Sequence, residues 1–430
     1  MPAQVTPRNR PRRLCLRLAT VLLAAGAALL VTACGSGSKS GTTGGSNSGT
    51  AANASGTGSC GTIPTQMPAD PDKLLASLPA RIRPAYNGLP ITVEPSAWAH
   101  WKPKHGPPYK VGVEFPNNNT PFGAGFINRV QQLGHQNPKI SQVVVRLANN
   151  SVPTQVRQLN ELIRDRVDII IGASLASQAT APVVQAAKKA GIPYVEFTGI
   201  APAPGAIGFF TGQWEAGAQM AQALARFTNG KGRVLMMHGI PQTQVDQVTF
   251  AGANAVFKNC PGIKTVGNLV GQFAPPVAKG VTLQYLSANP QPVNGAFQTA
   301  GMAVGILQAF QQLGREVPPI ADQGATPGFL AYWNAHKDSY KAFATGNGTQ
   351  TTTDLVWDIA MRTLAGGGPK LNNIFLPAIP ITNDNVAEWV KPGWTASTVS
   401  PAYAEPPNRD LLVTDKEWDA FFNNPNAGAE

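Results

Sequence analysis

Residues 166–197 read RVDIIIGASLASQATAPVVQAAKKAGIPYVEF, in which two short apolar runs flank an amphipathic segment. The runs Val167–Gly172 and Pro193–Phe197 are rich in β-branched and aromatic residues and predict buried strands. The segment between them, Ser177–Ala190, predicts a helix. Gly191-Ile192-Pro193 ends this helix and begins the second strand. A strand, a helix and a second strand in this order predict a βαβ unit with parallel strands.

The same alternation extends over most of the chain after Tyr109. Further strands are predicted at Lys110–Phe115, Gln142–Leu147, Arg233–His238, Thr265–Val270, Gly295–Phe297 and Pro319–Ala321. Further helices are predicted from Pro121 to about Gly134, with Thr120 as N-cap, and at Gln155–Arg164, Glu215–Phe227, Ala251–Phe257, Met302–Leu313, Gly328–His336 and Asp354–Leu364. Because so long a chain exceeds one open sheet of ordinary size, we expect an α/β fold with two parallel sheets. Their facing strand ends would enclose one cleft.

Residues 1–33 have the composition of a secretory lipoprotein signal peptide. Arginines precede an apolar run from Leu18 to Val31, which is shorter than a membrane span. The run ends in Val31-Thr32-Ala33-Cys34-Gly35, which resembles a bacterial lipobox, so Cys34 is expected to carry lipid and become the new N-terminus. An ordinary signal peptide that happens to include a cysteine is the alternative. Arg12-Arg13 leaves both the general secretory and the twin-arginine export routes open.

Two segments without a sheet pattern follow the lipobox. Residues 34–61 are almost entirely Gly, Ser, Thr, Ala and Asn, a composition that buries too little apolar surface to fold and predicts a flexible tether. Residues 62–107 form a Pro-rich N-terminal extension with a short helix expected at Pro71–Leu78. The sequence assigns no function to this extension.

Charge and cysteine usage restrict the functional class. The formal charge is +11, but five arginines of the signal segment contribute to it, and no basic cluster with interleaved aromatics follows. Nucleic acid is therefore not an expected partner. Of the four cysteines, Cys15 leaves with the signal peptide and Cys34 takes the lipid. In an oxidising compartment Cys60 and Cys260 are expected to form a disulfide, with two unrelated thiols as the alternative. No Cys/His spacing fits zinc, and no cofactor is predicted.

Several short motifs follow Tyr109 in a fixed order. They are Val111-Gly112-Val113 with Thr120-Pro121-Phe122, Arg166–Gly172, Ala186–Val195, Ala216-Gly217 through Gly232–Leu235, and Phe375-Leu376-Pro377 with Ile381–Asn385. In this order the chain resembles the type I periplasmic binding proteins, the sugar-type substrate-binding proteins of ABC transporters that include ribose- and galactose-binding proteins. The resemblance implies two Rossmann-like lobes joined by a three-crossover hinge. Residues 109–200 and 347–380 would form lobe 1, residues 201–346 lobe 2, and residues 381–430 a C-terminal extension. A ligand would bridge both lobes and favour the closed form.

The resemblance also implies positions for the ligand-binding residues. They are Phe122, Thr198, Trp214, Thr249, Thr299 and Gln323, with Gln298 and Asp322 as alternates. Core packing is the alternative role for Phe122, and helix packing for Trp214. Where sugar-binding members carry charged residues, this chain has hydroxyl, amide and small residues. The expected pocket therefore has aromatic walls and neutral polar groups, lacks carboxylate and guanidinium groups, and suits a small neutral molecule such as a sugar. An aromatic or lipid-like catabolite is the competing ligand class.

Together these features predict an exported, lipid-anchored solute-binding protein on the extracytoplasmic face of the plasma membrane. Its expected partners are a small-molecule ligand and the permease of an ABC importer, and it is expected to be a monomer. A sensor that presents its ligand to a chemoreceptor or sensor kinase is the alternative, and a structural surface protein is a third. The sequence has no nucleophile elbow, phosphate-binding loop or metal motif, so catalysis is not expected. His238 closes an apolar strand, either as a cleft residue or as a strand-end histidine with its hydrogen bond satisfied.

Overall fold

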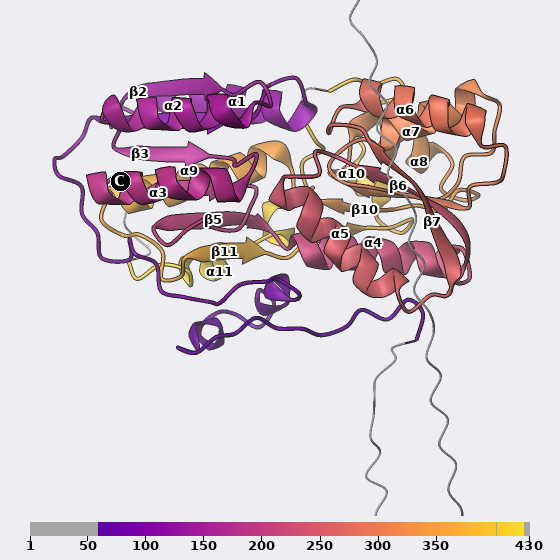
Figure 1. Ribbon diagram of the computed structural model, residues 1–430, viewed down its shortest axis with the longest axis horizontal. Helices are drawn as coiled ribbons and strands as arrows, with labels where there is room; N and C mark the ends of the chain where they lie inside the picture. Colours follow the sequence, from indigo (N-terminus) through magenta and orange to yellow (C-terminus); the bar gives the residue numbers. More distant parts are fainter. Residues whose placement is uncertain (1–58, 401, 425–430) are drawn as a thin grey trace, which may run out of the picture. The chain divides into compact units, whose positions relative to one another are not determined.

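The computed structural model describes residues 59–400 and 402–424, which contain two six-stranded sheets (Figure 1). The first sheet has the order β11-β5-β4-β3-β1-β2 and the second the order β12-β10-β9-β8-β6-β7. The first contains β1 (Tyr109–Phe115), β2 (Ile140–Leu147), β3 (Ile169–Gly172), β4 (Tyr194–Phe197), β5 (Ala206–Thr211) and β11 (Asn373–Leu376). The second contains β6 (Lys231–His238), β7 (Gly262–Val270), β8 (Gly295–Gln298), β9 (Ile320–Gln323), β10 (Phe343–Gly346) and β12 (Ile379–Ile381). Strands β10 and β12 pair antiparallel, and the other pairs are parallel.

Helices flank both sheets, as buried parallel strands require. Four helices belong with the first sheet: α1 (Pro121–Gln136), α2 (Val152–Arg164), α3 (Ser177–Ala190) and α9 (Thr349–Leu364). Five belong with the second: α4 (Gln213–Phe227), α5 (Gln244–Phe257), α6 (Pro275–Ala288), α7 (Ala303–Gln312) and α8 (Pro327–Ala335). Local signals set several ends. Thr120 Oγ1 caps α1 by accepting a hydrogen bond from Gly123 N at 3.1 Å, and Gly191 ends α3 with φ of 74°.

The chain passes between the two lobes three times, which confirms the predicted two-lobe α/β architecture. The passages lie between β5 and α4, between β10 and α9, and between β11 and β12. Lobe 1 therefore holds the first sheet with α1, α2, α3 and α9, and lobe 2 holds the second sheet with α4–α8. Because parallel strands point their carboxyl ends to one edge, each lobe offers one row of loops for a site.

The lobe boundary expected at residue 200 is wrong by one strand. Residues 206–211 form β5 in the first sheet, where Phe209 pairs with Phe197 and Ile374. The preceding Pro- and Gly-containing loop obscured this strand. Similarly, residues 379–381 form β12 in the second sheet, although residues up to 380 were assigned to lobe 1.

Some elements were not predicted, and two helices begin earlier than predicted. Strand β10 is a four-residue segment, and α6 begins with two prolines and contains Gly280, so neither shows a clear period. Helix α9 begins at Thr349 rather than Asp354, because the threonines of its first turn have low helix propensity. Helix α5 begins at Gln244, seven residues before the predicted start.

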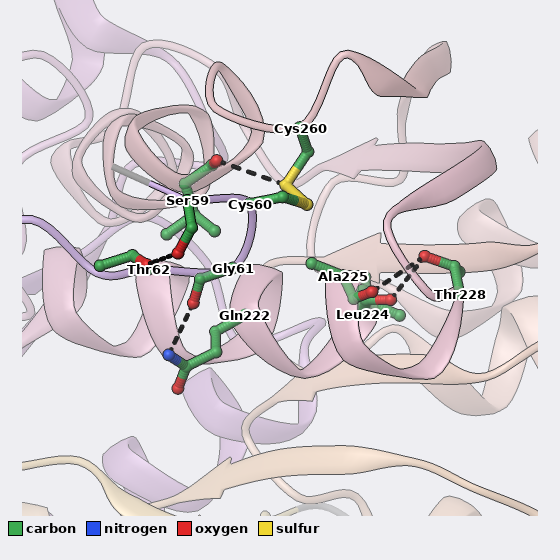
Figure 2. The surroundings of a disulfide bond; sticks show 10 residues. Ser59, Cys60, Gly61, Thr62, Gln222, Leu224, Ala225, Thr228 and Cys260 are labelled. Atoms are coloured by element: carbon green, nitrogen blue, oxygen red, sulfur yellow. Dashed lines mark hydrogen bonds between the residues drawn. A yellow bond between two sulfur atoms is a disulfide. The ribbon is translucent and has the colours of Figure 1, made fainter. Parts of the chain in front are cut away.

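The N-terminal extension is attached to both lobes. Cys60 and Cys260 are joined in a disulfide, with a Cα–Cα distance of 4.5 Å (Figure 2). Beside it, the Gln222 side-chain amide of α4 donates to Gly61 O at 2.7 Å. Further along, Tyr86 donates from its hydroxyl to Asn373 O of β11 at 2.8 Å. Residues 60–61 therefore lie on lobe 2, and Tyr86 on lobe 1. The short helix predicted at Pro71–Leu78 is present as a 3-10 helix, Leu74–Ser77.

The C-terminal extension returns to lobe 1 after helix α10 (Val386–Trp389). Its helix α11 (Asp415–Asp419) packs on α9, where Trp418 Nε1 donates to Asp358 Oδ2 at 2.6 Å. The signal peptide, Cys34 and almost all of the tether lie outside the described residues. Within the described residues, no helix has both the length and the apolar character of a membrane span.

Candidate ligand-binding site

A cavity lies between the two lobes at the carboxyl ends of their strands. Its open volume, including the part that communicates with solvent, is about 820 Å³. Lobe 1 contributes Phe115, Pro116, Asn117, Thr120, Phe122, Ala173, Ser174, Glu196, Thr198 and Phe210. Lobe 2 contributes Ile240, Thr243, Gln244, Val245, Phe273, Ala300, Gln323 and Gly324, and Asn347 and Tyr403 complete the wall. Among these described residues none carries a guanidinium or ammonium group, so the lining gives no fixed counter-charge for an anion.

Phe122 forms the aromatic wall of lobe 1. The Thr120 cap and Pro121 fix the start of α1, so Phe122 lies on its first turn, directly after β1. Its ring centroid lies 5.6 Å from Phe197 and 6.0 Å from Phe210. The side chain is nearly buried but lines the cavity, so its ring both packs on the core and faces the space where a ligand would lie.

A buried carboxylate, Glu196 of β4, lines the cavity, so the expectation of a pocket without carboxylates is wrong. Its two oxygens accept hydrogen bonds from Ser174 N at 2.7 Å, Ser174 Oγ at 2.6 Å and the Tyr194 hydroxyl at 3.0 Å. Burial nevertheless raises the pKa of Glu196 to about 7, because loss of water outweighs the hydrogen bonds that favour the charged form. Near neutral pH this group can therefore accept or donate a hydrogen bond.

A second buried carboxylate, Glu114 of β1, lies close to the first. The Gln155 amide donates to Glu114 Oε2 at 2.6 Å, and Gln155 Oε1 accepts from Leu175 N at 2.8 Å. Burial raises the pKa of Glu114 to about 8, and the nearby charge of Glu196 raises it further. The charge of Glu196 thus disfavours the ionised form of Glu114.

One side chain joins the lobes beside the cavity. Gln244, at the first position of α5 in lobe 2, accepts from Ile200 N at 2.6 Å through Oε1. Its Nε2 donates to Ser177 Oγ at 2.6 Å, at the start of α3 in lobe 1. Because these two bonds cross from one lobe to the other, they can form only when the lobes are in contact.

The structure brings three of the six predicted positions to the cavity: Phe122, Thr198 and Gln323. Thr198 lies in the loop after β4 with φ of 75°. Gln323, at the end of β9, is held by an amide hydrogen bond to Gln213 Oε1 at 2.8 Å. Their contact with a ligand stays a prediction.

The other three predicted positions do not line the cavity. Thr249 is fully buried behind Gln323, with 3.4 Å between Thr249 Oγ1 and Gln323 Oε1. Thr299 donates to Asp246 Oδ1 at 2.9 Å and accepts from Gly239 N at 3.0 Å. Trp214 packs against Gly88 of the N-terminal extension, where no space remains for a Cβ atom. Trp214 thus packs on the N-terminal extension.

The alternates and the strand-end histidine also have partners within the protein. Gln298 and Asp322 are fully buried and hydrogen-bonded to each other, and burial raises the pKa of Asp322 to about 7. His238 Nδ1 lies 2.7 Å from Asp246 Oδ2, and its ring stacks on Phe250 with a centroid distance of 3.5 Å. His238 therefore has the satisfied strand-end arrangement. The described residues contain no cluster of His, Cys, Asp or Glu that could hold a metal ion.

Several polar lining residues were missed from the sequence. Asn117 and Ser174 come two residues after β1 and β3, and Thr243 precedes α5, so these positions between a strand and a helix were an available signal. Asn347, after β10, is buried, and its Oδ1 has no hydrogen-bond partner among the described residues. Such an atom is costly unless a ligand or water satisfies it. Tyr403 comes from the C-terminal extension, and no local pattern indicated it.

Comparison with known proteins identifies a matching family, a protein of similar sequence and solved structures of similar fold. The family model described as periplasmic binding protein domain matches residues 111–364. The xylitol-binding protein of Mycolicibacterium smegmatis is 28% identical over 181 residues, which cover 42% of this chain and 52% of that protein. This chain therefore spans about half the length of that curated relative.

Two solved structures share the fold. An ABC transporter solute-binding protein of Thermobispora bispora superposes with a TM-score of 0.62 at 21% identity, over 70% of this chain and 93% of its own. One from Bacillus halodurans, solved with bound myo-inositol, gives a TM-score of 0.59 at 17% identity over 66% and 98% of the two chains. The family match covers more than half of the chain, and the two-lobe arrangement agrees with it. The chain thus belongs to the periplasmic binding protein domain family.

Proposed function

We propose that this chain is an extracytoplasmic solute-binding lipoprotein that captures a small polyhydroxylated, uncharged molecule between its lobes and delivers it to an ABC importer. The observation that carries this proposal is the chemistry of the interlobe cavity. Phe122 and Phe210 offer apolar ring faces, while Asn347, Gln323 and Glu196 offer polar groups. Rings that cover C–H surfaces, with amides and carboxylates beside them, are the complement of a polyol or sugar.

Two details favour such a ligand over a fully apolar one. The side-chain oxygen of Asn347, Oδ1, is buried and has no hydrogen-bond partner among the described residues, so a ligand hydroxyl could donate to it. The Glu196 carboxyl, with a pKa raised to about 7 by burial, suits hydroxyl groups as donor or acceptor. The relatives that bind xylitol and myo-inositol support the same ligand class for this chain.

The remaining parts of the proposal rest on sequence and family. The lipobox at residues 31–35 would place the acylated Cys34 at the membrane, with the binding body on the extracytoplasmic side. In the proposed cycle, ligand shifts the lobes toward the closed form, which the permease then recognises. We propose that the protein does so as a monomer and without catalysis or a cofactor.

Calorimetry of the full chain in detergent against xylitol, myo-inositol, D-ribose and benzoate tests the ligand class. Binding of a polyol or sugar, weakened in Phe122→Ala, is the expected result. A saturating ligand at 100 times its dissociation constant should also raise the free energy of unfolding by about 2.7 kcal/mol. Binding of benzoate alone would instead support the aromatic-catabolite alternative and refute the polyol assignment.

A further inference from the structure

Tyr403 reaches the cavity from a part of the chain outside the matched family region, which ends at residue 364. Its ring centroid lies 5.4 Å from that of Phe122 in lobe 1. The hydroxyl end of the ring lies against Gly301 and Gly324 in lobe 2. Tyr403 therefore fills the space between the lobes at the point where a ligand would have to bridge them.

The glycines opposite Tyr403 leave room for its ring. A Cβ added at Gly324 would lie 2.8 Å from the ring, and one added at Gly301 only 2.5 Å from it. Both residues have positive φ, 114° and 82°, a conformation that side chains disfavour. The absence of side chains at these two positions thus forms a socket for the ring.

Hydrogen bonds on both sides hold the backbone of residues 402–405 in place. Tyr403 N donates to Thr349 Oγ1 at 3.0 Å, and Ala404 N donates to Ala325 O at 3.0 Å. Thr349 begins helix α9 of lobe 1, whereas Ala325 follows β9 of lobe 2. The segment is therefore attached to both walls of the site.

Glu405 anchors the segment further by capping α9. The N-cap residue of this helix, Gly348, has no side chain to accept from the first turn. Glu405 accepts instead, from Gln350 N at 2.7 Å and from Thr351 N at 2.9 Å. A carboxylate at a helix N-terminus satisfies unpaired amides and interacts favourably with the helix dipole.

The Tyr403 side chain is buried and lines the cavity, and its hydroxyl makes no hydrogen bond to another described residue. A phenol without a partner among the described residues is free to bond a ligand hydroxyl. Phe122 and the two glycines cover only part of the Tyr403 ring. The rest of the residue lines the cavity.

We propose that residues 402–405 form a fixed third wall of the ligand site, and that Tyr403 is a specificity-determining residue whose hydroxyl bonds a hydroxyl of the bound polyol. This inference rests on the proposed function, because it assigns a residue to the same cavity. It differs from a self-inhibiting plug in one respect: the wall stays in place when ligand binds.

Two measurements on the full chain test the proposal. The first is the affinity for xylitol and myo-inositol, by calorimetry, of the wild type, Tyr403→Phe, Tyr403→Ala and the control Tyr332→Phe on α8. Loss of one neutral hydrogen bond predicts an affinity about 2- to 12-fold lower for Tyr403→Phe. We expect a larger loss, at least about tenfold, for Tyr403→Ala, and no change for Tyr332→Phe.

The second measurement is hydrogen exchange at the Tyr403 amide, which donates to Thr349 of lobe 1 and should be protected with and without ligand. Wild-type affinity in Tyr403→Phe for every probe that binds would overturn the inference while leaving the proposed function intact. Loss of amide protection when ligand binds would also overturn it, because the segment would then leave the site as a plug does. If the wild type binds neither xylitol nor myo-inositol, the polyol assignment fails and this inference fails with it.

Discussion

Replacing Glu196 with glutamine should change how the stability of the protein depends on pH. Glutamine keeps the shape of the side chain and one acceptor oxygen for Ser174, but it cannot ionise. The pKa of Glu196 has an ordinary value of 4.5 and is raised to about 7 by burial. Since the folded state holds this proton more tightly than the unfolded state, ionisation destabilises the fold.

The sign follows from proton counting. Below pH 4.5 both states are protonated, and Glu196 has no pH-dependent effect. Between about pH 4.5 and 7 the folded protein binds more protons than the unfolded chain, so the free energy of unfolding falls as pH rises. With the two pKa values above, the loss between pH 5 and pH 8 amounts to roughly 2 to 3 kcal/mol. Glu114 adds a loss of the same sign, because burial also raises its pKa.

The assay is urea denaturation of the ligand-free protein at pH 5 and pH 8. The wild type should lose roughly 2 to 3 kcal/mol more than Glu196→Gln between these pH values. A control variant, Glu388→Gln, removes an exposed carboxylate of α10 and should behave like the wild type. Equal losses in the wild type and in Glu196→Gln would refute the reasoning, because Glu196 would then titrate alike in the folded and unfolded states.

Three further predictions concern the covalent links and the contact between the lobes. Reduction of the Cys60–Cys260 disulfide, which closes a separation of 200 residues, should lower the free energy of unfolding by up to about 5 kcal/mol in urea denaturation. The stability of the double serine variant should not respond to reductant. A urea midpoint of the wild type that does not change on reduction would contradict the disulfide. Cys34→Ser should move the protein from the membrane fraction to the soluble fraction of cells, and full retention in the membrane would argue against acylation. Gln244→Ala removes two hydrogen bonds between the lobes and should weaken xylitol binding by roughly 5-fold or more. The control Gln311→Ala, at an exposed position of α7, should leave the affinity unchanged. Equal xylitol affinities of the wild type and Gln244→Ala would show that Gln244 does not stabilise the closed form.

Most of the strands were predictable because the strands of a buried parallel sheet are continuous apolar runs. Ile169–Gly172 is buried along its whole length, and its run of isoleucines is visible in the sequence. Strand β5 has a similar composition, but it follows a loop rich in proline and is not preceded by a helix. A rule that expects strand and helix to alternate therefore placed it in the wrong lobe.

The site was less predictable than the fold, because a cavity depends on side-chain direction. Thr249 and Gln323 were both selected by resemblance, yet Thr249 lies buried inside helix α5, whereas Gln323 ends β9 on the cavity side. Glu196 was overlooked because it lies inside an apolar strand, where a carboxylate is not expected. Its burial depends on hydrogen bonds from Ser174, which follows β3, and from Tyr194 of its own strand.

The contacts of the two extensions limit how the hinge can work. Cys60 fixes the end of the tether, just before the N-terminal extension, to lobe 2, and Tyr86 fixes the extension to lobe 1. Residues 402–405 likewise bond to Thr349 and to Ala325, on opposite sides of the cavity. In the proposed hinge cycle, opening of the lobes would therefore break one of the two bonds of the C-terminal segment. The segment makes several bonds to lobe 1 but a single backbone bond to Ala325 of lobe 2, so the Ala404–Ala325 bond is the one that would break. On opening, Tyr403 would then remain with lobe 1, where Glu405 caps α9 and the Phe122 ring lies beside it.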